Sequence, residues 1–540
     1  MAKMKRSEAQ ELMNKLLAMN ESKEVDFDSV ELDSASYSEV EEKIVSLEEN
    51  KSEKYGVAGA NRAILDGILD YQKEHGHLPD AGVVAEAVNF ANEILDSAIE
   101  GNGVTNTNPE HFTVMEPIVG IRSFIATAIP FATVIPAEKK SGEGSIVIVS
   151  HHAGKTTGQY KEGASLNGVA GGNVYISTER THILTTSNRR TYSGKITNVQ
   201  ETWETCDQEA SVSPLSPNST QVFINGLLVI DGTDGKGDTE ESATGYITLD
   251  QKYLITAEVN ILTGEVTVKA DKELPEQTEV LVTGCLNTEK DEFLTPSVTV
   301  KGTQHNFHAK WWCTDVSLTK EAATQFQNEI GISPLFEGVI AVRKQLQAET
   351  LFKLISRLTK IGKEVNASEF DFDWTGHQGA NKSSSDIAKE LVNQIGTVSK
   401  KMAKQNGSHG VSHIYVGDKM ASILQGMGDN YFQASGLKPR PDVYRLGRLK
   451  TLDIDVYYSP KGVYEDEYAE MLLIGANPQD VTKNPVVLGE PTPPFTTPLT
   501  ETTNNKTHGY RVRGQHIVAL NPVPEYQQSA AVIKCTNLPL

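Results

Sequence analysis

A Gly-Lys-Thr triplet at Gly154, Lys155 and Thr156 is the first candidate for ligand chemistry. A phosphate-binding loop requires another glycine five residues before the Gly-Lys pair, because that spacing lets backbone N–H groups surround a phosphate. Val149 occupies the required position. The spacing therefore excludes a nucleotide-binding loop, and we expect the tip of a β-hairpin that carries a lysine.

Two pairs of histidines could ligate a metal ion. His151 and His152 have no cysteine or carboxylate nearby in sequence, so we expect a solvated loop pair. His305 and His308 would point to opposite faces of a strand. An acidic, glycine-rich segment at 231–241 does not have the spacing of an EF-hand calcium loop. The sequence predicts no metal site.

Paired carboxylates in the segment EFDFDW could share a proton, as in some acid–base catalysts. Asp371 and Asp373 alternate with the aromatic residues Phe370, Phe372 and Trp374. This alternation favours a solvated strand edge over a catalytic pocket. The sequence also lacks the G-x-S-x-G pattern of a nucleophile elbow. We therefore expect no catalytic residues, no cofactor and no enzymatic activity.

Adjacent tryptophans at Trp311 and Trp312 could stack on a sugar or a base, although a core or subunit contact is the more common role of such residues. The chain has four cysteines, too few for a disulfide framework. We expect them to be free thiols.

The elements that would position these residues fall into blocks. Residues 150–310 have short β-branched runs separated by Gly, Thr and Asn, with a hairpin expected at Thr263-Gly264. Leu335 to Ile361 keep helical spacing, with Gly362 as a C-cap, which predicts one helix of about 28 residues, roughly 42 Å long. A second helix should begin at the polar cluster 383–386.

Further strands are expected beyond the second helix. The segment 452–458 alternates apolar and polar residues, which predicts a strand with one solvated face. The segment EMLLIGAN predicts a buried strand. Residues 486–498 should be extended because of their prolines, and a closing strand pair or one bent strand should follow.

The first hundred residues form a separate block. Ala9, Leu12 and Leu16 have helical spacing, and two amphipathic helices are expected within 58–100, joined by a turn at HGHLPDAG. Between the first of these three helices and the other two, the segment 25–49 is too poor in apolar residues to fold alone. We expect a detachable leader with helical and disordered parts.

Composition limits the class of protein. The 540 residues hold 50 Lys and Arg against 71 Asp and Glu, a formal net charge of −21, which argues against a protein that coats nucleic acid. The N-terminus has no signal-peptide pattern, and no apolar run is long enough to cross a membrane. We expect synthesis in a cytoplasm.

Three segments resemble the major capsid protein of tailed bacteriophages, most closely the T-even type. In residues 118–150, Arg122, the triplet Ala128-Ile129-Pro130, Pro136 and the strand after Gly144 fill the places of that family's N-terminal pattern. The second segment is the long helix with its approach, from Thr314. The third is the C-terminal order of two strands, a Pro-rich stretch and HGYRVRGQHIVALNP.

The resemblance implies an α+β fold of the Hong Kong 97 type with an inserted β-rich domain. Its parts would be a leader (1–100), an N-arm and first strand (101–150), and an E-loop with the β insertion (151–310). A peripheral domain with the spine helix (311–380), an axial domain (381–475) and a C-terminal extended segment with closing peripheral strands (476–540) would follow.

The resemblance also implies the function of such a chain. It would assemble into hexamers and pentamers of an icosahedral phage head around double-stranded DNA, without sequence-specific DNA binding and without membrane contact, in the host cytoplasm. Its partners would be scaffold, prohead protease, portal and decoration proteins. In the T-even type, a protease cuts after a Glu that follows an apolar residue two positions earlier. Glu100, which we prefer, and Glu49 fit that pattern.

Three alternatives remain open at this point. A cellular nanocompartment shell could share the fold, although it has no need of an acidic leader or an insertion. A β-rich glycan-binding surface protein could use 150–310 with Trp311 and Trp312. An unrecognised hydrolase is the last, and no site supports it.

Overall fold

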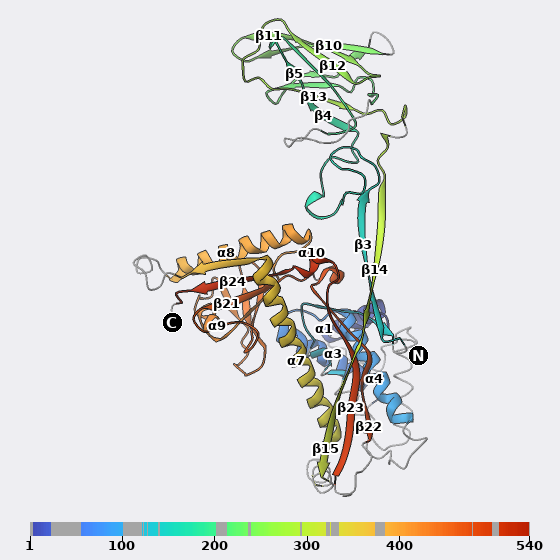
Figure 1. Ribbon diagram of the computed structural model, residues 1–540, viewed down its shortest axis with the longest axis vertical. Helices are drawn as coiled ribbons and strands as arrows, with labels where there is room; N and C mark the ends of the chain where they lie inside the picture. The colour runs from blue at the N-terminus through green and yellow to red at the C-terminus, as the bar shows by residue number, and fades with distance from the viewer. Residues whose placement is uncertain are drawn as a thin grey trace. The chain divides into compact units, whose positions relative to one another are not determined.

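A computed structural model describes most of the chain and divides it into two compact units. The first unit comprises Met1–Val147 and Gln304–Leu540, and the second comprises Ile148–Thr303. The described residues are 4–22, 56–100, 121–122, 124–126, 128–138, 141–200, 213–235, 239–291, 294–319, 325, 334–372, 384–477, 479–498 and 507–538. Helices and long strands occur together, so the expected α+β class is confirmed (Figure 1).

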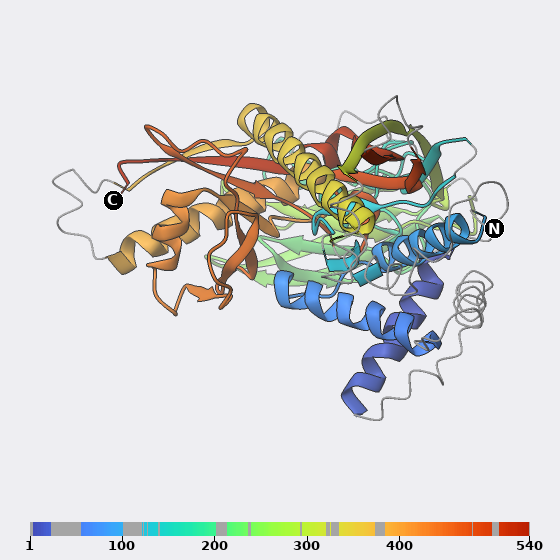
Figure 2. The ribbon, with the colours of Figure 1, turned by 90° about the horizontal axis from the view of Figure 1, so that it is seen from below.

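The leader folds into three helices, as the apolar spacing predicted: α1 (Arg6–Ser22), α3 (Gly56–His75) and α4 (Ala81–Glu100). In Figure 2 they are the blue helices, and α1 packs on both others. Ala9, Leu12 and Leu16 are buried in the core that these helices share. We call α1, α3 and α4 the leader helices. The expectation for 25–49 lies outside the described residues.

A seven-stranded sheet is the centre of the first unit. Its order is β16-β24-β21-β17-β20-β19-β18. The bounds are Ala367–Asp371 for β16, Ala530–Thr536 for β24, Ala469–Ile474 for β21, His413–Val416 for β17, Ile454–Tyr458 for β20, Tyr444–Leu449 for β19 and Phe432–Ala434 for β18. Every residue of β21 is buried, which confirms the strand predicted there.

Helices pack on this sheet. They are α7 (Pro334–Val365), α8 (Ser384–Asn406), α9 (Asp418–Gln425) and the short α10 (Pro524–Gln527). α7 contacts β24 and β21, and α8 contacts β24 and β16. The long helix and the helix predicted after the polar cluster are therefore confirmed.

Gly362 was wrongly predicted as the end of the long helix. α7 continues to Val365 and has 32 residues. A Cβ atom at Gly362 would lie 2.9 Å from the backbone carbon of Ala531 in β24. Glycine is therefore needed inside the helix because the sheet backbone approaches closely there, and it does not terminate the helix.

The strand at 452–458 was predicted to have one solvated face, and this was wrong. In β20 the residues Ile454, Asp455, Val456 and Tyr457 are all buried. Asp455 is buried because Arg445 of β19 pairs with it, with Arg445 Nη2 2.6 Å from Asp455 Oδ1. The polar residue in this alternating pattern therefore indicates a charged partner on the next strand and not exposure to water.

A second sheet in this unit has the order β1-β22-β23-β15. Its strands are β1 (Ala132–Val134), β22 (Val486–Pro498), β23 (Thr507–Leu520) and β15 (Lys310–Thr319). β22 contains the prolines and is extended as predicted, with register shifts between Gly489 and Phe495. β23 is one continuous strand that pairs with β22 and β15.

The second unit is a β-sandwich whose two sheets share one apolar core, and a smaller cluster of Ala153, Tyr160 and Tyr175 lies apart from that core. One sheet has the order β5-β6-β12-β11-β10-β9 and the other β4-β13-β7-β8. The first contains β5 (Thr185–Thr186), β6 (Thr191–Lys195), β9 (Asp234–Gly235), β10 (Glu240–Thr248), β11 (Lys252–Asn260) and β12 (Glu265–Ala270). The second contains β4 (Glu179–Ile183), β7 (Gln221–Ile224), β8 (Leu227–Asp231) and β13 (Val280–Cys285). The predicted hairpin at Thr263-Gly264 is confirmed, with Gly264 at φ +70° between β11 and β12.

The chain leaves the first unit along β3 (Glu143–Ala153) and returns along β14 (Val298–His308). These two strands form a sheet with β2 (Ala137–Glu138). Within the residues listed above, no helix combines the length and the apolar character that a membrane span requires.

Candidate functional site

Among the described residues, those that the sequence suggested for chemistry lie on different elements and are not brought together. Gly154 follows β3, and its N–H donates to the Ser297 carbonyl at 2.7 Å. His151 and His152 were predicted in a loop, but they lie within β3. The His152 ring is held at both nitrogens, 2.9 Å from the Gly163 carbonyl and 2.8 Å from Ser150 Oγ. The loop prediction failed because the buried apolar residues Ile146 and Ile148 indicate only part of the strand. β3 continues past them to Ala153.

The other suggested metal ligands and acids also lie apart. His308 Nδ1 is 3.2 Å from Glu143 Oε1, and His305 lies three residues earlier on β14. Asp371 ends β16, an edge strand, and accepts a hydrogen bond from Asn537. Asp373 lies outside the described residues. Among the described residues no cluster of His, Cys, Asp and Glu is arranged to hold a metal ion.

The two tryptophans have different surroundings. Trp311 on the edge strand β15 is 62% exposed. Trp312 pairs with Gly514 of β23, and a Cβ at Gly514 would lie 2.9 Å from the Trp312 ring. Cys285, Cys313 and Cys535 are free, as expected, and burial raises the pKa of Cys535 to about 12.

A cluster of buried titratable groups lies where the leader helices meet the seven-stranded sheet. His75, the last residue of α3, has Nδ1 3.1 Å from the Tyr457 hydroxyl of β20. The ring of His77 lies 6.2 Å from that of His75 and 6.1 Å from that of His413 in β17. The ring centres of His413 and Tyr457 are 5.8 Å apart. We call His75, His77, His413 and Tyr457 the histidine cluster.

Burial determines the protonation of this cluster. Desolvation holds the pKa of His75 well below its usual value, and the neighbouring His77 and His413 lower it further. Desolvation and the nearby His77 lower the pKa of His413 to about 3. Burial also raises the pKa of Tyr457. At neutral pH His75 and His413 are therefore neutral, and Tyr457 retains its proton.

A cavity of about 500 Å³ adjoins the cluster, and it is lined by α1, the turn after α3, β17 and β20. His413 is 6% exposed and faces this cavity, with no hydrogen-bond partner for its Nε2. On the opposite ring atom, His413 Nδ1 lies 2.7 Å from Ser412 Oγ. In a neutral imidazole one ring nitrogen donates and the other accepts, so Nδ1 interacts with Ser412 while Nε2 is left unpartnered toward the cavity.

Ion pairs join the leader to the rest of the unit around the cluster. Arg440, just before β19, pairs with Glu74 of α3. Arg122 Nε lies 2.6 Å from Asp70 Oδ2 of α3. Within the leader itself, Arg6 of α1 pairs with Asp80 in the turn before α4 at 2.5 Å. These pairs are partly exposed, so each contributes little on its own.

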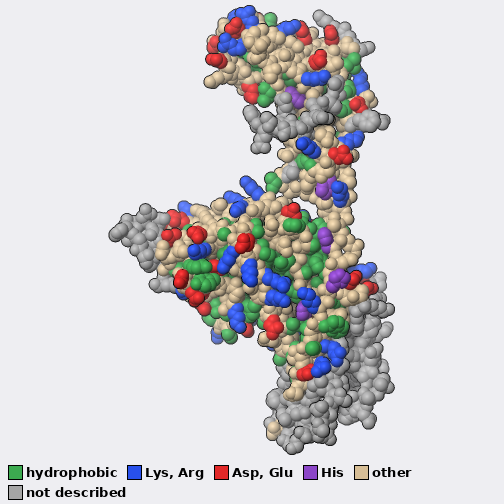
Figure 3. Space-filling view, viewed as in Figure 1, with side chains coloured by type: hydrophobic (Ala, Val, Ile, Leu, Met, Phe, Trp, Pro, Cys, Tyr) green, Lys and Arg blue, Asp and Glu red, His purple; other side chains and the backbone are tan. Residues whose placement is uncertain are grey.

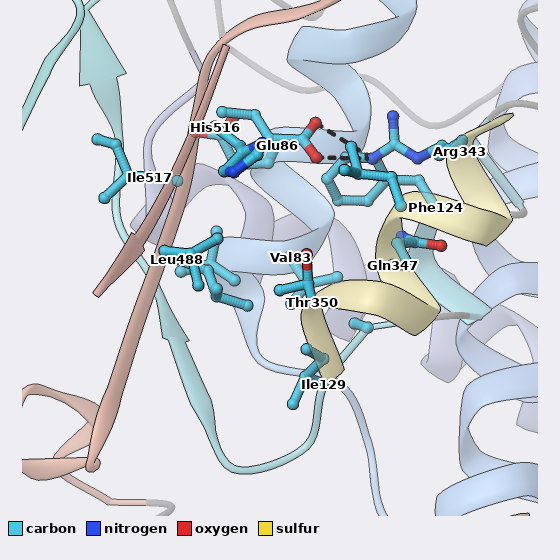
Figure 4. A pocket seen from close by; sticks show the side chains of 16 residues that line it. Val83, Glu86, Phe124, Ile129, Arg343, Gln347, Thr350, Leu488, His516 and Ile517 are labelled. Carbon is cyan, nitrogen blue, oxygen red and sulfur yellow. Dashed lines mark hydrogen bonds and ion pairs between the residues drawn. The ribbon is translucent and has the colours of Figure 1, made fainter. Parts of the chain in front are cut away.

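A second joint links α7 to β22 and to Phe124. Arg343 of α7 is buried, lies 3.1 Å from Glu490 Oε2 of β22, and stacks 4.2 Å from the Phe124 ring centre. Figure 4 shows Arg343 and Phe124 side by side, with Glu86 of α4 and His516 of β23 nearby. The cavity that they line is about 90 Å³, too small for an ordinary organic ligand. This joint is structural.

Sequence reasoning missed the histidine cluster. The segment HGHLPDAG was interpreted only as a turn, and it is one, but it also places His75 and His77 against the sheet. The available signal was two histidines flanking a glycine at a helix end. Gly76 has φ +77°, and a Cβ there would meet the Arg445 guanidinium at 2.4 Å, so only glycine fits.

The two candidate cleavage residues are not equally described. Glu100 is the last residue of α4, and its side chain is outside the described set. Glu49 lies outside the described residues altogether.

Comparison with known proteins gave structural matches only. No protein-family model and no curated protein matches the sequence. The capsid of the jumbo bacteriophage PhiKZ matches with a TM-score of 0.36 and 8% identity, over 75% of this chain and 91% of that one. The mature capsid of bacteriophage PhiM1 matches with a TM-score of 0.27 and 11% identity, over 56% and 84%. The holo-SrpI encapsulin complex of Synechococcus elongatus PCC 7942 matches with a TM-score of 0.24 and 10% identity, over 45% and 78%. The matched structures include phage capsids, the class of protein that the sequence resembles.

Proposed function

We propose that this chain is the major capsid protein of a tailed bacteriophage, with a Hong Kong 97-type fold, and that it assembles into hexamers and pentamers of an icosahedral head around double-stranded DNA. The observation that carries the proposal is the apolar exposure of two long strands. Val147 and Val149 on β3, and Val298 and Val300 on β14, are each about half exposed or more. Apolar side chains in such numbers on paired strands favour burial against another protein surface.

The architecture supports the same proposal. The β-sandwich unit, Ile148–Thr303, would be the E-loop with its insertion, and α7 would be the spine helix. The seven-stranded sheet would hold much of the axial domain. On the face shown in Figure 3, acidic and basic side chains are interspersed, which suits a wall that does not bind packaged DNA tightly. Scaffold, prohead protease, portal and decoration proteins would be its partners, and the virion its location.

Electron microscopy of the purified full-length chain tests this function. We expect shells, tubes or hexameric rings. Replacing Val149 and Val300 by aspartate should lower the assembled fraction by at least about tenfold, since loss of one buried valine costs about 1.5–3 kcal/mol. Threonine at both positions is the matched control, because it keeps the β-branched shape and adds no charge.

The outcomes separate the alternatives. Particles that lack DNA and retain a cargo enzyme would assign the chain to a nanocompartment shell. Normal assembly of the aspartate variant would remove the role proposed for the two strands. A chain that stays monomeric, alone and with its co-expressed phage partners, would contradict a shell function.

We also propose that the leader is cleaved after Glu100 during maturation, with Glu49 as the alternative position. N-terminal sequencing of the chain from mature particles should begin at Gly101. A start at Asn50 would select the alternative, and an intact start at Met1 or Ala2 would refute cleavage.

A further inference from the structure

The leader helices pack directly against the rest of the first unit, in addition to being joined to it by the chain that follows them. Val84 and Val88 of α4 share one buried core with Ile121 and Ile125, which come after the leader. At Gly67 of α3, a Cβ would lie 3.2 Å from the Arg122 Cα, so the backbones nearly touch. A break in the chain between 100 and 121 would therefore leave the leader bound, because these contacts do not depend on covalent continuity.

The polar part of this interface concentrates neutral histidines. His75 is 9% exposed and His413 is 6% exposed, and they come from opposite sides of the interface. His77 lies about 6 Å from both rings. Protonation of both His75 and His413 would place two positive charges in this largely buried interface, where they would repel each other.

We propose that the histidine cluster is an acid-sensitive latch that holds the leader helices on the seven-stranded sheet and releases them when the histidines acquire protons. The proposal concerns the intact chain and does not depend on cleavage or on shell assembly. Release would expose His75 and His413 to water and separate them from each other.

The direction of the pH dependence follows from linkage. The pKa of both histidines is lowered when the leader is docked, so the released state binds more protons. Docking is therefore fully stable above the ordinary histidine pKa of about 6.5 and weakens as the pH falls below it. At pH 5, each histidine that returns to its ordinary pKa shifts the equilibrium toward release by about 30-fold.

Other charged groups around the cluster modify this effect. From the leader, the facing groups are Arg6, Tyr71, Glu74, His77 and Asp80. From the rest of the unit they are Tyr415, Arg440, Arg445, Arg448, Asp453, Asp455 and Tyr457. Arg440 and Arg445 oppose protonation of His75. Asp455 is paired with Arg445, so its charge is largely compensated.

Hydrogen exchange of the full-length chain tests the latch. Protection factors, corrected for the intrinsic effect of pH, are measured for α3 and for α8 at pH 7.5 and pH 5. In the wild type, α3 should lose protection by at least about 30-fold at pH 5, while α8 keeps its protection. The double variant His75→Gln, His413→Gln should keep α3 protected at both pH values, because glutamine preserves polarity and does not titrate.

A second buried histidine supplies the control. His409 lies outside the interface, and burial lowers its pKa to about 4, so His409→Gln should behave as the wild type does. Unchanged α3 protection in the wild type at pH 5 would overturn the latch, as would equal loss in the double variant. If α8 is unprotected at pH 7.5 in the double variant, that variant has not folded. Each single variant keeps one of the two histidines, so it should lose about 30-fold less α3 protection at pH 5 than the wild type does, and a loss equal to the wild type's would overturn the proposal.

Discussion

Replacing Asp455 by leucine is expected to lower the free energy of unfolding of the first unit by about 3–5 kcal/mol, the usual cost of leaving one member of a buried ion pair alone. Asp455 Oδ1 receives two hydrogen bonds from Arg445, at 2.8 Å from Nε and 2.6 Å from Nη2. Both side chains are nearly buried, with 14% of Arg445 and 10% of Asp455 exposed. Without the carboxylate, the guanidinium would keep its desolvation cost and lose its partner.

The position of the Arg445–Asp455 pair increases the expected loss of stability. Arg445 lies against the turn at Gly76 and beside His75, where the leader contacts the sheet. A free guanidinium there would also oppose docking of the leader helices. The measurement is urea unfolding followed by far-ultraviolet circular dichroism, since the described α-helices all belong to the first unit.

Two matched variants make this prediction specific. Asp453→Asn removes the nearer of the two carboxylates beside Arg448, but that pair is exposed, 75% at Asp453, so stability should change by at most about 1 kcal/mol. Adding Arg445→Met to Asp455→Leu should recover most of the loss, because an apolar pair needs no compensating charge. An Asp455→Leu variant as stable as Asp453→Asn would show that the pair does not hold the sheet.

The sequence was informative where a pattern is local and ambiguous where two distant segments meet. The long helix α7 was evident because Leu335 to Ile361 repeat at helical spacing within one segment. The burial of β20 was not evident, since its polar residues are explained by Arg445 on the next strand. A polar residue in an alternating strand looks the same whether water or an arginine faces it.

The histidine cluster illustrates the same limit for the candidate site. His75 and Tyr457 are 382 positions apart, and no spacing rule connects them. The turn that carries His75 and His77 could be predicted from Gly76 and Pro79, but its docking partner could not. By contrast, the absence of a nucleotide loop followed from Val149 alone, because that motif is defined within a single short segment.

Replacing Gly362 by alanine is expected to have the second large effect. The direction of this effect is opposite to the general rule for glycine inside a helix. Replacing glycine by alanine inside a helix normally stabilises it by up to about 1 kcal/mol. At Gly362 we expect the opposite, a loss of about 1–3 kcal/mol, because the new Cβ has nowhere to go. It would lie 2.9 Å from the Ala531 carbonyl carbon, 3.1 Å from its Cα and 3.0 Å from Val532 Cγ2. Two of these are backbone atoms of β24, which is paired on both sides and cannot retreat.

Gly396 in the middle of α8 is the matched control for this substitution. A Cβ there would lie 3.5 Å from Leu452 Cδ2, an ordinary contact with a flexible side chain. Gly396→Ala should therefore raise the urea midpoint, while Gly362→Ala lowers it, in the same unit and by the same chemical change. If both variants shift the midpoint in the same direction, the close approach of α7 to β24 is not what requires glycine. The sign of the difference thus tests how closely the long helix packs on the sheet.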